Sequence, residues 1–430
     1  MTYKIYTLGC KVNEYESEVM DNLLEKAGYQ KNDNPQICII NTCTVTNTAD
    51  NKSKKLIRSL KRKYPNAIIV ATGCFIQNKK DLENLGIDIA LGNKDKSKIV
   101  EYLNNYKNEK IEKIYSIDEM NFEDMTLNNS NLTRAYIKIE DGCDNYCTYC
   151  IIPYVRGHVR SKQKDKIIAE AKNLINKGHK EIVLTGIHTG HYHHQDYDLS
   201  DLISDLCKLN GLKRLRLSSI EITELNDKFL KVLKENSVLV NHLHIPLQSG
   251  CDKILKLMNR KYDVKYFETK IKKIKKIRPH INITTDVIVG FPDETEKDFA
   301  QTLNTIKKIN FTKIHVFPYS KREGTVAANM KNQITGDIKK QRVKKLIDLS
   351  KQLEQNYMKE NLNKKISFIP EIYKEGYLIG HSENYLLIKA KGNCNYLNKE
   401  IEIETNKIDY PYIISKINDW FITKYMLKLI

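Results

Sequence analysis

Three cysteines lie close together near the middle of the chain, in the segment Cys143-Asp-Asn-Tyr-Cys147-Thr-Tyr-Cys150. Three thiolates at this spacing can wrap around a single metal site. A structural zinc ion normally takes four ligands, and no fourth cysteine is near, although His158 could serve. A [4Fe-4S] cluster held by three cysteines keeps one iron open for an outside ligand. The segment therefore indicates an iron–sulfur site that does chemistry, with structural zinc as the alternative.

Three further cysteines are far apart in the sequence but follow similar segments. They are Cys10, Cys43 and Cys74, and each comes shortly after a predicted strand, over residues 3–8, 36–40 and 67–71. Parallel strands present their carboxyl ends at one edge of a sheet, where open α/β folds place their ligands. The sequence therefore predicts a second cluster site at this edge. The alternative is three unrelated buried thiols, since free cysteine packs as a small apolar residue.

Composition restricts the class of protein. The 430 residues include 71 Lys+Arg against 53 Asp+Glu, a formal charge of +18, and the mean hydropathy is −0.51. No apolar run reaches the length of a membrane span, and Lys4, Lys11 and Glu14 interrupt the region where a signal peptide would be apolar. We expect a cytoplasmic protein with no membrane partner, whose clustered cysteines bind metal rather than form disulfides. The positive charge favours a polyanionic partner, although AT-rich coding would also enrich lysine.

The elements that must position these cysteines fall into three regions of an α/β chain. Residues 1–115 alternate strand and helix signals as a parallel α/β unit, and 116–132 form a polar, Asn-rich linker. Residues 133–362 predict a partial or closed (β/α) barrel, and 363–430 predict a small β-barrel. The predicted barrel strands are six short apolar runs, over 135–139, 181–184, 214–217, 242–245, 282–289 and 312–317.

Several segments resemble one enzyme family over nearly the whole chain. The cysteine triplet, with Tyr149 before its last cysteine, resembles the defining motif of radical S-adenosylmethionine (SAM) enzymes. Further matching segments are Tyr-Thr-Leu-Gly-Cys-Lys-Val-Asn at 6–13, Asn-Thr-Cys-Thr-Val at 41–45, Thr-Gly-Cys at 72–74, Ile-Ile-Pro-Tyr-Val-Arg-Gly at 151–157, His-Ile-Pro-Leu-Gln-Ser-Gly at 244–250 and Asp-Val-Ile-Val-Gly-Phe-Pro at 286–292. Together they resemble the radical SAM methylthiotransferases, which attach a methylthio group at an unactivated C–H position. The resemblance implies a cluster domain, a radical SAM domain and a C-terminal TRAM-like β domain.

Within that family, two segments look most like one branch. Gly-Cys-Lys-Val-Asn at 9–13, followed by Tyr-Glu-Ser, and Ile-Ile-Pro-Tyr at 151–154 are similar to the enzymes that methylthiolate C2 of N6-threonylcarbamoyladenosine 37 in tRNA. The branch acting on isopentenyladenosine 37 tends to show a Gln-Met-Asn version of the first segment. A third branch acts on an aspartate of ribosomal protein S12. Both remain alternatives, as does a non-catalytic RNA-binding protein with zinc or a redox cluster.

The resemblance also implies cofactors and contacts. It implies two [4Fe-4S] clusters and SAM, with Cys143, Cys147 and Cys150 holding the cluster that cleaves SAM to a 5′-deoxyadenosyl radical. The other three cysteines would hold the cluster that carries the sulfur, while a second SAM supplies the methyl group. The implied SAM contacts, each of which could instead be a tight turn, are Tyr149, Gly186, Ser218, Glu221, Val289 and Gly290. An electron donor and a sulfur donor are implied partners, and the sequence does not identify them.

A basic stretch over 52–63 is the candidate RNA contact. Lys54, Lys55, Arg58 and Arg62 are spaced to share one helix and could bind tRNA phosphates, although a solvated basic helix would look the same. The C-terminal region carries six lysines against seven carboxylates over 366–418, so phosphate binding by that region is less expected. Four histidines at 188, 191, 193 and 194 lack strand or helix spacing, so no metal site is expected there.

Overall fold

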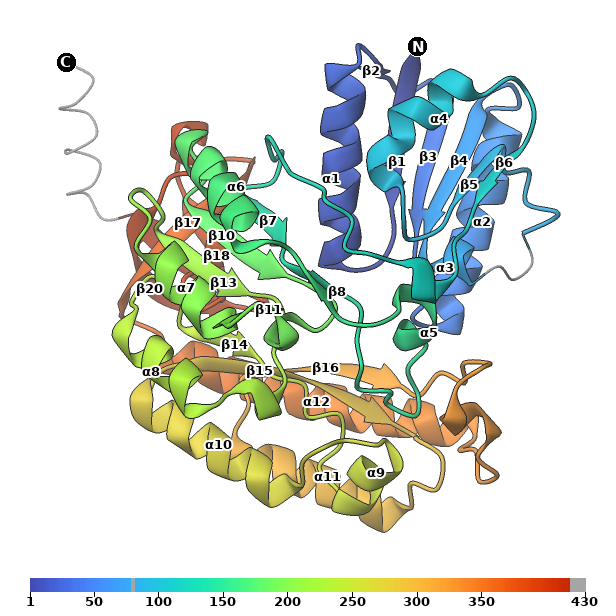
Figure 1. Cartoon of the computed structure of the whole chain (residues 1–430). Coiled ribbons are helices and arrows are strands. Elements are labelled where there is room, and N and C mark those ends of the chain that lie inside the picture. The colour runs from blue at the N-terminus through green and yellow to red at the C-terminus, as the bar shows by residue number, and fades with distance from the viewer. Residues whose placement is uncertain (79–81, 418–430) are drawn as a thin grey trace, which may run out of the picture.

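Three bodies of secondary structure follow one another along the chain (Figure 1). The computed structural model describes residues 1–78 and 82–417. The first body is blue to cyan in Figure 1, the central one green to orange, and the last one red. The predicted α/β class, with a small C-terminal β-barrel, is confirmed. Among the described residues, none of the helices has both the length and the apolar character that a membrane span requires.

The first body is a parallel sheet of six strands in the order β2-β1-β3-β4-β5-β6. Its strands are β1 Thr2–Thr7, β2 Gln30–Lys31, β3 Ile37–Thr42, β4 Ile68–Gly73, β5 Ile89–Leu91 and β6 Ile111–Lys113, and its helices are α1 Lys11–Lys26, α2 Asn47–Lys63, α3 Cys74–Gln77 and α4 Ile99–Asn105, with a short 3-10 helix η1 at Lys96–Lys98. Helices α1 and α2 lie on opposite faces of the sheet (Figure 1). The register pairs Thr7 with Asn41 and Asn41 with Thr72, so β1, β3 and β4 end level. The loops carrying Cys10, Cys43 and Cys74 therefore leave the same edge of the sheet.

The segment between β6 and β7 (Arg134–Lys138) packs against α1. It contains a short 3-10 helix, η2 Ile117–Glu119, and Met125 and Leu127 are buried. The Tyr15 hydroxyl of α1 donates a hydrogen bond to the Met125 carbonyl at 2.6 Å, and the Ser130 hydroxyl donates to the Glu18 carboxylate at 2.9 Å. Specific contacts therefore hold this segment against α1.

The central body is a partial barrel made of two parallel sheets, in the orders β13-β10-β7 and β14-β15-β16. Its remaining elements are β8 Glu140–Asp141, α5 Ile152–Arg156, β9 Arg160–Ser161, α6 Lys164–Asn176, β10 Glu181–Thr185, η3 Thr189–His191, β11 His193–His194, β12 Tyr197–Asp198, α7 Leu199–Cys207, β13 Arg214–Leu217, η4 Ile222–Glu224, α8 Asp227–Glu235, β14 His242–His244, α9 Asp252–Leu257, α10 Val264–Ile277, β15 Asn282–Val289, α11 Glu296–Ile309, β16 Lys313–Pro318, η5 Val326–Asn329 and α12 Gly336–Glu360. A parallel bridge joins Leu215 of β13 to Leu239, which precedes β14 in the chain. The six predicted strands are present, each within one residue of its expected ends.

The last body is a closed five-stranded barrel in the order β17-β18-β19-β21-β20. Its elements are β17 Lys365–Lys374, β18 Tyr377–Ser382, β19 Leu387–Lys391, η6 Cys394–Tyr396, β20 Ile401–Asp409 and β21 Tyr412–Ile417. Residues 418–430 of the expected third domain lie outside the described residues. The Arg214 guanidinium of β13 binds Ser367 Oγ at 2.6 Å, and Asn282 Nδ2 of β15 donates to the Asn384 carbonyl at 2.6 Å. These contacts hold β17 and the turn between β18 and β19 against the partial barrel.

Candidate functional site

The central cysteine triplet lies on the loop that follows β8. Cys143, Cys147 and Cys150 are free, partly exposed thiols, and all three line one cavity of about 220 Å³. The Cys143 amide donates to the Gly157 carbonyl at 3.0 Å, and the Cys150 amide donates to the Cys147 carbonyl at 2.9 Å. Burial raises the pKa of both Cys143 and Cys150 to about 12, and neighbouring thiolates oppose ionisation further. A bound cation would relieve this cost, so the donor set suits an iron cluster.

A buried arginine contacts this triplet. Arg260 Nη1 donates to Cys147 Sγ at 3.2 Å, and Arg260 Nη2 binds the Glu221 carboxylate. Glu221 and Tyr149, both predicted SAM contacts, line the same cavity. The structure therefore gathers these two residues with the triplet. Arg260 stands outside the cysteine motif, and no pattern in the sequence marks it.

A second cavity of about 540 Å³ adjoins the first and shares the lining residues Ile152, Ile187, Ser219 and Asp286 with it. Gly186 and Ser218, two more predicted contacts, line this second cavity. A Cβ at Gly186 would lie 2.6 Å from Glu140 Oε2, so only glycine lets the loop pass this close to that carboxylate. Glu140 Oε2 in turn accepts the His188 amide at 2.6 Å, which fixes the loop after β10.

The last two predicted SAM contacts lie elsewhere. Val289 is fully buried at the end of β15, and the Gly290 amide donates to the Glu294 carboxylate at 2.6 Å. Neither residue is among those that line the two cavities described here. Gln248, by contrast, lines the first cavity and pairs through its backbone with Val287 of β15.

The structure also brings the N-terminal cysteines together. Cys10 precedes α1 and lines the second cavity, Cys43 follows β3 directly, and Cys74 begins α3. A Cβ at Gly9 would lie 2.9 Å from Cys43 Cβ, so the loops of Cys10 and Cys43 touch. Burial raises the pKa of Cys43 to about 11, and the Cys74 and Cys10 thiolates act in the same direction. Three thiols from three strands are therefore neighbours at one sheet edge.

A second buried arginine contacts this triplet. Arg156 Nε donates to Cys74 Sγ at 3.2 Å, and Asn93 Nδ2 donates to the same sulfur at 3.5 Å. Cys74 also packs in a small apolar cluster with Ile151 and Val155. Ile151 follows Cys150 in the chain, so this cluster joins the two cysteine triplets directly.

Arg156 belongs to a buried ion network that links the first two bodies. Its Nη1 binds Glu16 Oε1 at 3.1 Å and Asp141 Oδ1 at 3.0 Å, while Lys96 and Lys138 bind the Glu16 carboxylate at 2.6 and 2.9 Å. Burial alone would raise the pKa of Glu16, but Arg156, Lys138 and Lys96 hold that pKa well below its ordinary value. Arg160 Nη2 also lies 3.6 Å from Asp141 Oδ2, so four cations face two carboxylates here, which leaves positive charge beside the Cys74 sulfur.

The predicted RNA contacts share the exposed side of α2. Lys54, Lys55, Arg58 and Arg62 line a surface groove of about 540 Å³. The opposite side of the helix buries Ser53, Ile57 and Leu60. Near the start of α2, Arg322 of the central body binds Asp50 Oδ2 at 2.7 Å. The start of α2, close to Cys43 in the chain, is therefore held against the central body, and its basic face remains exposed.

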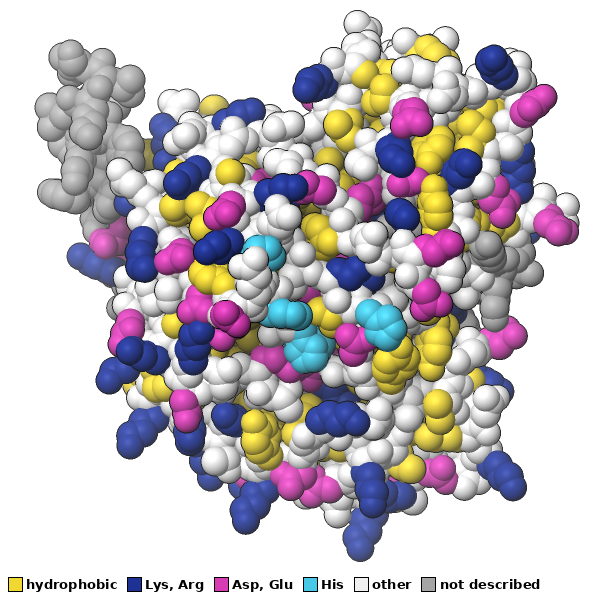
Figure 2. Space-filling view, viewed as in Figure 1, with side chains coloured by type: hydrophobic (Ala, Val, Ile, Leu, Met, Phe, Trp, Pro, Cys, Tyr) yellow, Lys and Arg dark blue, Asp and Glu magenta, His cyan; other side chains and the backbone are white. Residues whose placement is uncertain are grey.

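Two of the four clustered histidines converge after all. The His188 and His191 rings stack at 3.7 Å, and their nitrogens lie within 4.8 Å of each other and of a Glu224 carboxylate oxygen. Burial alone would raise the pKa of Glu224, but both histidines hold it at about 2. The spacing of the histidines in the sequence did not indicate this group, because Glu224 comes from a separate segment, η4. Figure 2 shows histidine side chains gathered near the middle of the displayed face.

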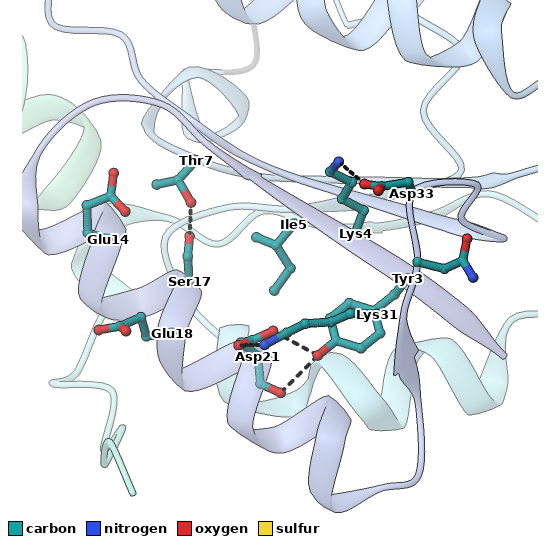
Figure 3. Close-up of a pocket in the computed structure, with 11 residues that line it drawn as sticks. Tyr3, Lys4, Ile5, Thr7, Glu14, Ser17, Glu18, Asp21, Lys31 and Asp33 are labelled. Carbon is teal, nitrogen blue, oxygen red and sulfur yellow. Dashed lines mark hydrogen bonds and ion pairs between the residues drawn. The ribbon is translucent and has the colours of Figure 1, made fainter. Parts of the chain in front are cut away.

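A cavity of about 710 Å³ lies away from both triplets, between β1 and α1 (Figure 3). Four of its charged side chains form ion pairs, Lys31 with Asp21 at 2.6 Å and Lys4 with Asp33 at 2.7 Å. None of the predicted site residues lines it. We therefore assign no chemistry to this cavity.

Comparisons with known proteins agree on a family. Residues 137–306 match the Radical SAM superfamily, and residues 2–92 match the Uncharacterized protein family UPF0004. The chain is 41% identical to "Threonylcarbamoyladenosine tRNA methylthiotransferase MtaB" of Bacillus subtilis, covering 96% of this chain and 95% of the relative. It is 39% identical to the protein of the same name from Thermotoga maritima, covering 91% and 92%. It is 34% identical to "tRNA-2-methylthio-N(6)-dimethylallyladenosine synthase" of Clostridium novyi, covering 94% and 93%.

Solved structures share the fold. The radical S-adenosylmethionine methyltransferase TsrM from Kitasatospora setae, with cobalamin and a [4Fe-4S] cluster bound, superposes with a TM-score of 0.55 at 12% identity. The match covers 74% of each chain. At this identity the likeness concerns the arrangement of elements alone.

Proposed function

Because the chain belongs to the radical SAM methylthiotransferase family, we propose that it adds a methylthio group to C2 of N6-threonylcarbamoyladenosine 37 in tRNA. The family is one of SAM-dependent transferases that carry a [4Fe-4S] cluster. The observation that carries the proposal is the pair of adjoining cavities, since one is lined by the central triplet and the other by Cys10. Relatives named for the threonylcarbamoyl substrate, at 41% and 39% identity, support this branch over the isopentenyl branch, whose relatives are 34% and 35% identical.

Cys143, Cys147 and Cys150 would hold the SAM-binding cluster. When bound, that cluster supplies one-electron reduction of SAM. Tyr149 and Glu221 line the same cavity and are proposed SAM contacts, with Gly186 and Ser218 on the adjoining cavity. Arg260 holds both Cys147 and Glu221, so it orients one cluster ligand and one proposed SAM contact together.

Cys10, Cys43 and Cys74 would hold a second [4Fe-4S] cluster, the site of the sulfur to be transferred. Their free thiols, their common sheet edge and the excess of buried cations around Arg156 support a site for an anionic iron–sulfur group. The buried network through Glu16 keeps this site in fixed orientation to the central triplet. An electron donor and a sulfur donor are needed as partners.

The protein's own contribution is position and exclusion of water. Adenine C2–H is too weakly acidic for any side-chain base to deprotonate, so the bound SAM and cluster would supply the chemistry that breaks this bond. The chain instead holds the adenosine between Cys10 on one side and the cavity of the central triplet on the other. The basic face of α2 supplies phosphate contacts that would keep the anticodon loop there.

The test is mass spectrometry of nucleosides from total tRNA of a deletion strain, its parent and a complemented strain. We expect the methylthio form of threonylcarbamoyladenosine to disappear in the deletion strain and return on complementation, while the isopentenyl form stays constant. Loss of the isopentenyl form alone would assign the other branch. Unchanged amounts of both forms would contradict tRNA as the substrate and direct attention to the aspartate of ribosomal protein S12.

A further inference from the structure

The second cavity, which Cys10 lines, has one end with positively charged side chains. Methylthio transfer does not itself require this charge. Lys11, the first residue of α1, lines this cavity beside Arg216, His242 and Tyr385. Within residues 1–78 and 82–417, the Lys11 ammonium has neither a hydrogen bond nor an ion pair. A lysine that lines a cavity without an acceptor is available to a ligand.

Arg216 is likewise incompletely bonded. It is 1% exposed, its Nε binds Glu181 Oε1 at 2.6 Å, and its Nη2 donates to the Glu383 carbonyl at 3.3 Å. Its Nη1 is buried and has no acceptor among the described residues. The buried Nδ1 of His242, on the neighbouring strand, also lacks a partner there. Buried polar groups in native proteins are rarely left unpaired, so a ligand oxygen is the expected acceptor.

Tyr385 reaches this end of the cavity from the C-terminal barrel. Its ring stacks on His242 at 4.6 Å, and the Arg216 and Arg134 guanidinium groups lie 4.7 and 5.4 Å from the ring centroid. Burial alone would raise the pKa of Tyr385, but Arg134, Lys11 and Arg216 hold it below its ordinary value. Surroundings that favour a phenolate also favour a carboxylate.

The negative charges near this end are already engaged. Asp286, which lines both cavities, lies 3.1 Å from His244 Nε2, and Glu181 binds both Arg216 and Arg214. Lys11 and the free Nη1 of Arg216 therefore remain for an incoming anion.

We infer that this end of the cavity binds a carboxylate on the N6 substituent of the target adenosine, and that Lys11 is a specificity-determining residue for it. The inference rests on the proposed function and deepens it. A threonylcarbamoyl group ends in a carboxylate, whereas an isopentenyl group has no polar atom. An apolar substituent would leave the Lys11 ammonium and the Arg216 Nη1 group without an acceptor, and such unpaired groups discriminate strongly between ligands.

The experiment uses reconstituted holoenzyme and three anticodon stem-loop RNAs. Adenosine 37 carries the threonylcarbamoyl acid, its neutral carboxamide or the isopentenyl group, and both Kd and methylthio product are measured. We expect wild type to bind the acid about tenfold or more tightly than the carboxamide, because hydrogen bonds to charged groups are worth this much. Equal binding of acid and carboxamide by wild type would overturn the inference without any variant.

Variants then assign the effect to Lys11. We expect Lys11→Met to weaken acid binding about 10- to 100-fold and carboxamide binding less than about twofold, and Lys11→Arg to restore acid binding. Lys26→Met, on an exposed residue of the same helix, is the matched control. Iron content equal to wild type shows that the neighbouring Cys10 site is intact. Equal weakening for acid and carboxamide would overturn the role of Lys11, whereas no product from wild type on the acid RNA would instead overturn the proposed function.

Discussion

The two cysteine triplets have similar surroundings, but one lies on a single loop and the other comes from three separate strand ends. The central triplet comes from one short loop after β8, whereas the N-terminal triplet is assembled from the ends of β1, β3 and β4. In each, one sulfur accepts a hydrogen bond from a buried arginine at 3.2 Å, from Arg260 to Cys147 and from Arg156 to Cys74. The first site therefore depends mainly on local sequence, and the second on the register of a whole sheet.

The two arginines differ in what else they hold. Arg260 binds Glu221, which remains partly exposed, within the central body. Arg156 sits in a fully buried network that includes Glu16 from the first body and Asp141 from the central one. The N-terminal site is thereby coupled to the docking of two bodies, and the central site is not.

The largest expected effect is on the reaction products, and it distinguishes the functions of the two triplets. Cys147→Ala should abolish 5′-deoxyadenosine formation from SAM, because it removes a ligand of the proposed SAM-binding cluster. Cys43→Ala should leave 5′-deoxyadenosine detectable but stop methylthio transfer. Both products are quantified by mass spectrometry after reduction of the reconstituted enzyme with RNA present. Identical behaviour of the two variants would contradict the division of labour, and Cys394→Ala, an exposed cysteine outside both triplets, is the control.

The next largest effect is on the free energy of unfolding, which the two arginines should change by different amounts. Arg156→Met leaves Glu16 and Asp141 buried with fewer cations, which should cost about 3–5 kcal/mol, while Arg260→Met should cost about 1–3 kcal/mol. Thermal unfolding of the apo and reconstituted proteins compares the two variants. We expect the larger fall in Tm with Arg156→Met, together with iron loss from the N-terminal site. An equal or larger fall with Arg260→Met would show that the buried network does not couple the two bodies.

The smallest expected effect concerns the basic face next to the N-terminal triplet. Arg58→Glu should weaken tRNA binding and lower the slope of log Kd against log salt by about 0.9 for each phosphate that the variant no longer neutralises. Lys344→Glu, an exposed position on α12, makes the same charge change on another body. Binding isotherms at several salt concentrations measure both slopes. Equal slopes for the two variants would indicate that α2 makes no specific phosphate contact.

A site formed by one short segment can be predicted from the sequence, whereas contacts between distant segments cannot. The strands and both cysteine groups were predictable because short apolar runs and adjacent motifs are local signals, and parallel strand ends must share an edge. Arg156, Arg260, Lys11 and Tyr385 were not assigned roles, because the residues that surround them come from distant segments. The convergence of His188 with Glu224 was missed for the same reason. Val289 and Gly290 were predicted from family position, and they lie outside both cavities.

The central claim is that both triplets hold clusters, and iron counting tests it most directly. Anaerobically reconstituted wild type should contain about eight iron atoms and about eight sulfides per chain, as two [4Fe-4S] clusters require. A variant with Cys10, Cys43 and Cys74 all changed to alanine should contain about four of each, and so should the matching variant of Cys143, Cys147 and Cys150. About four iron atoms in wild type, all lost with the central triplet, would contradict the claim and leave the N-terminal cysteines as buried thiols.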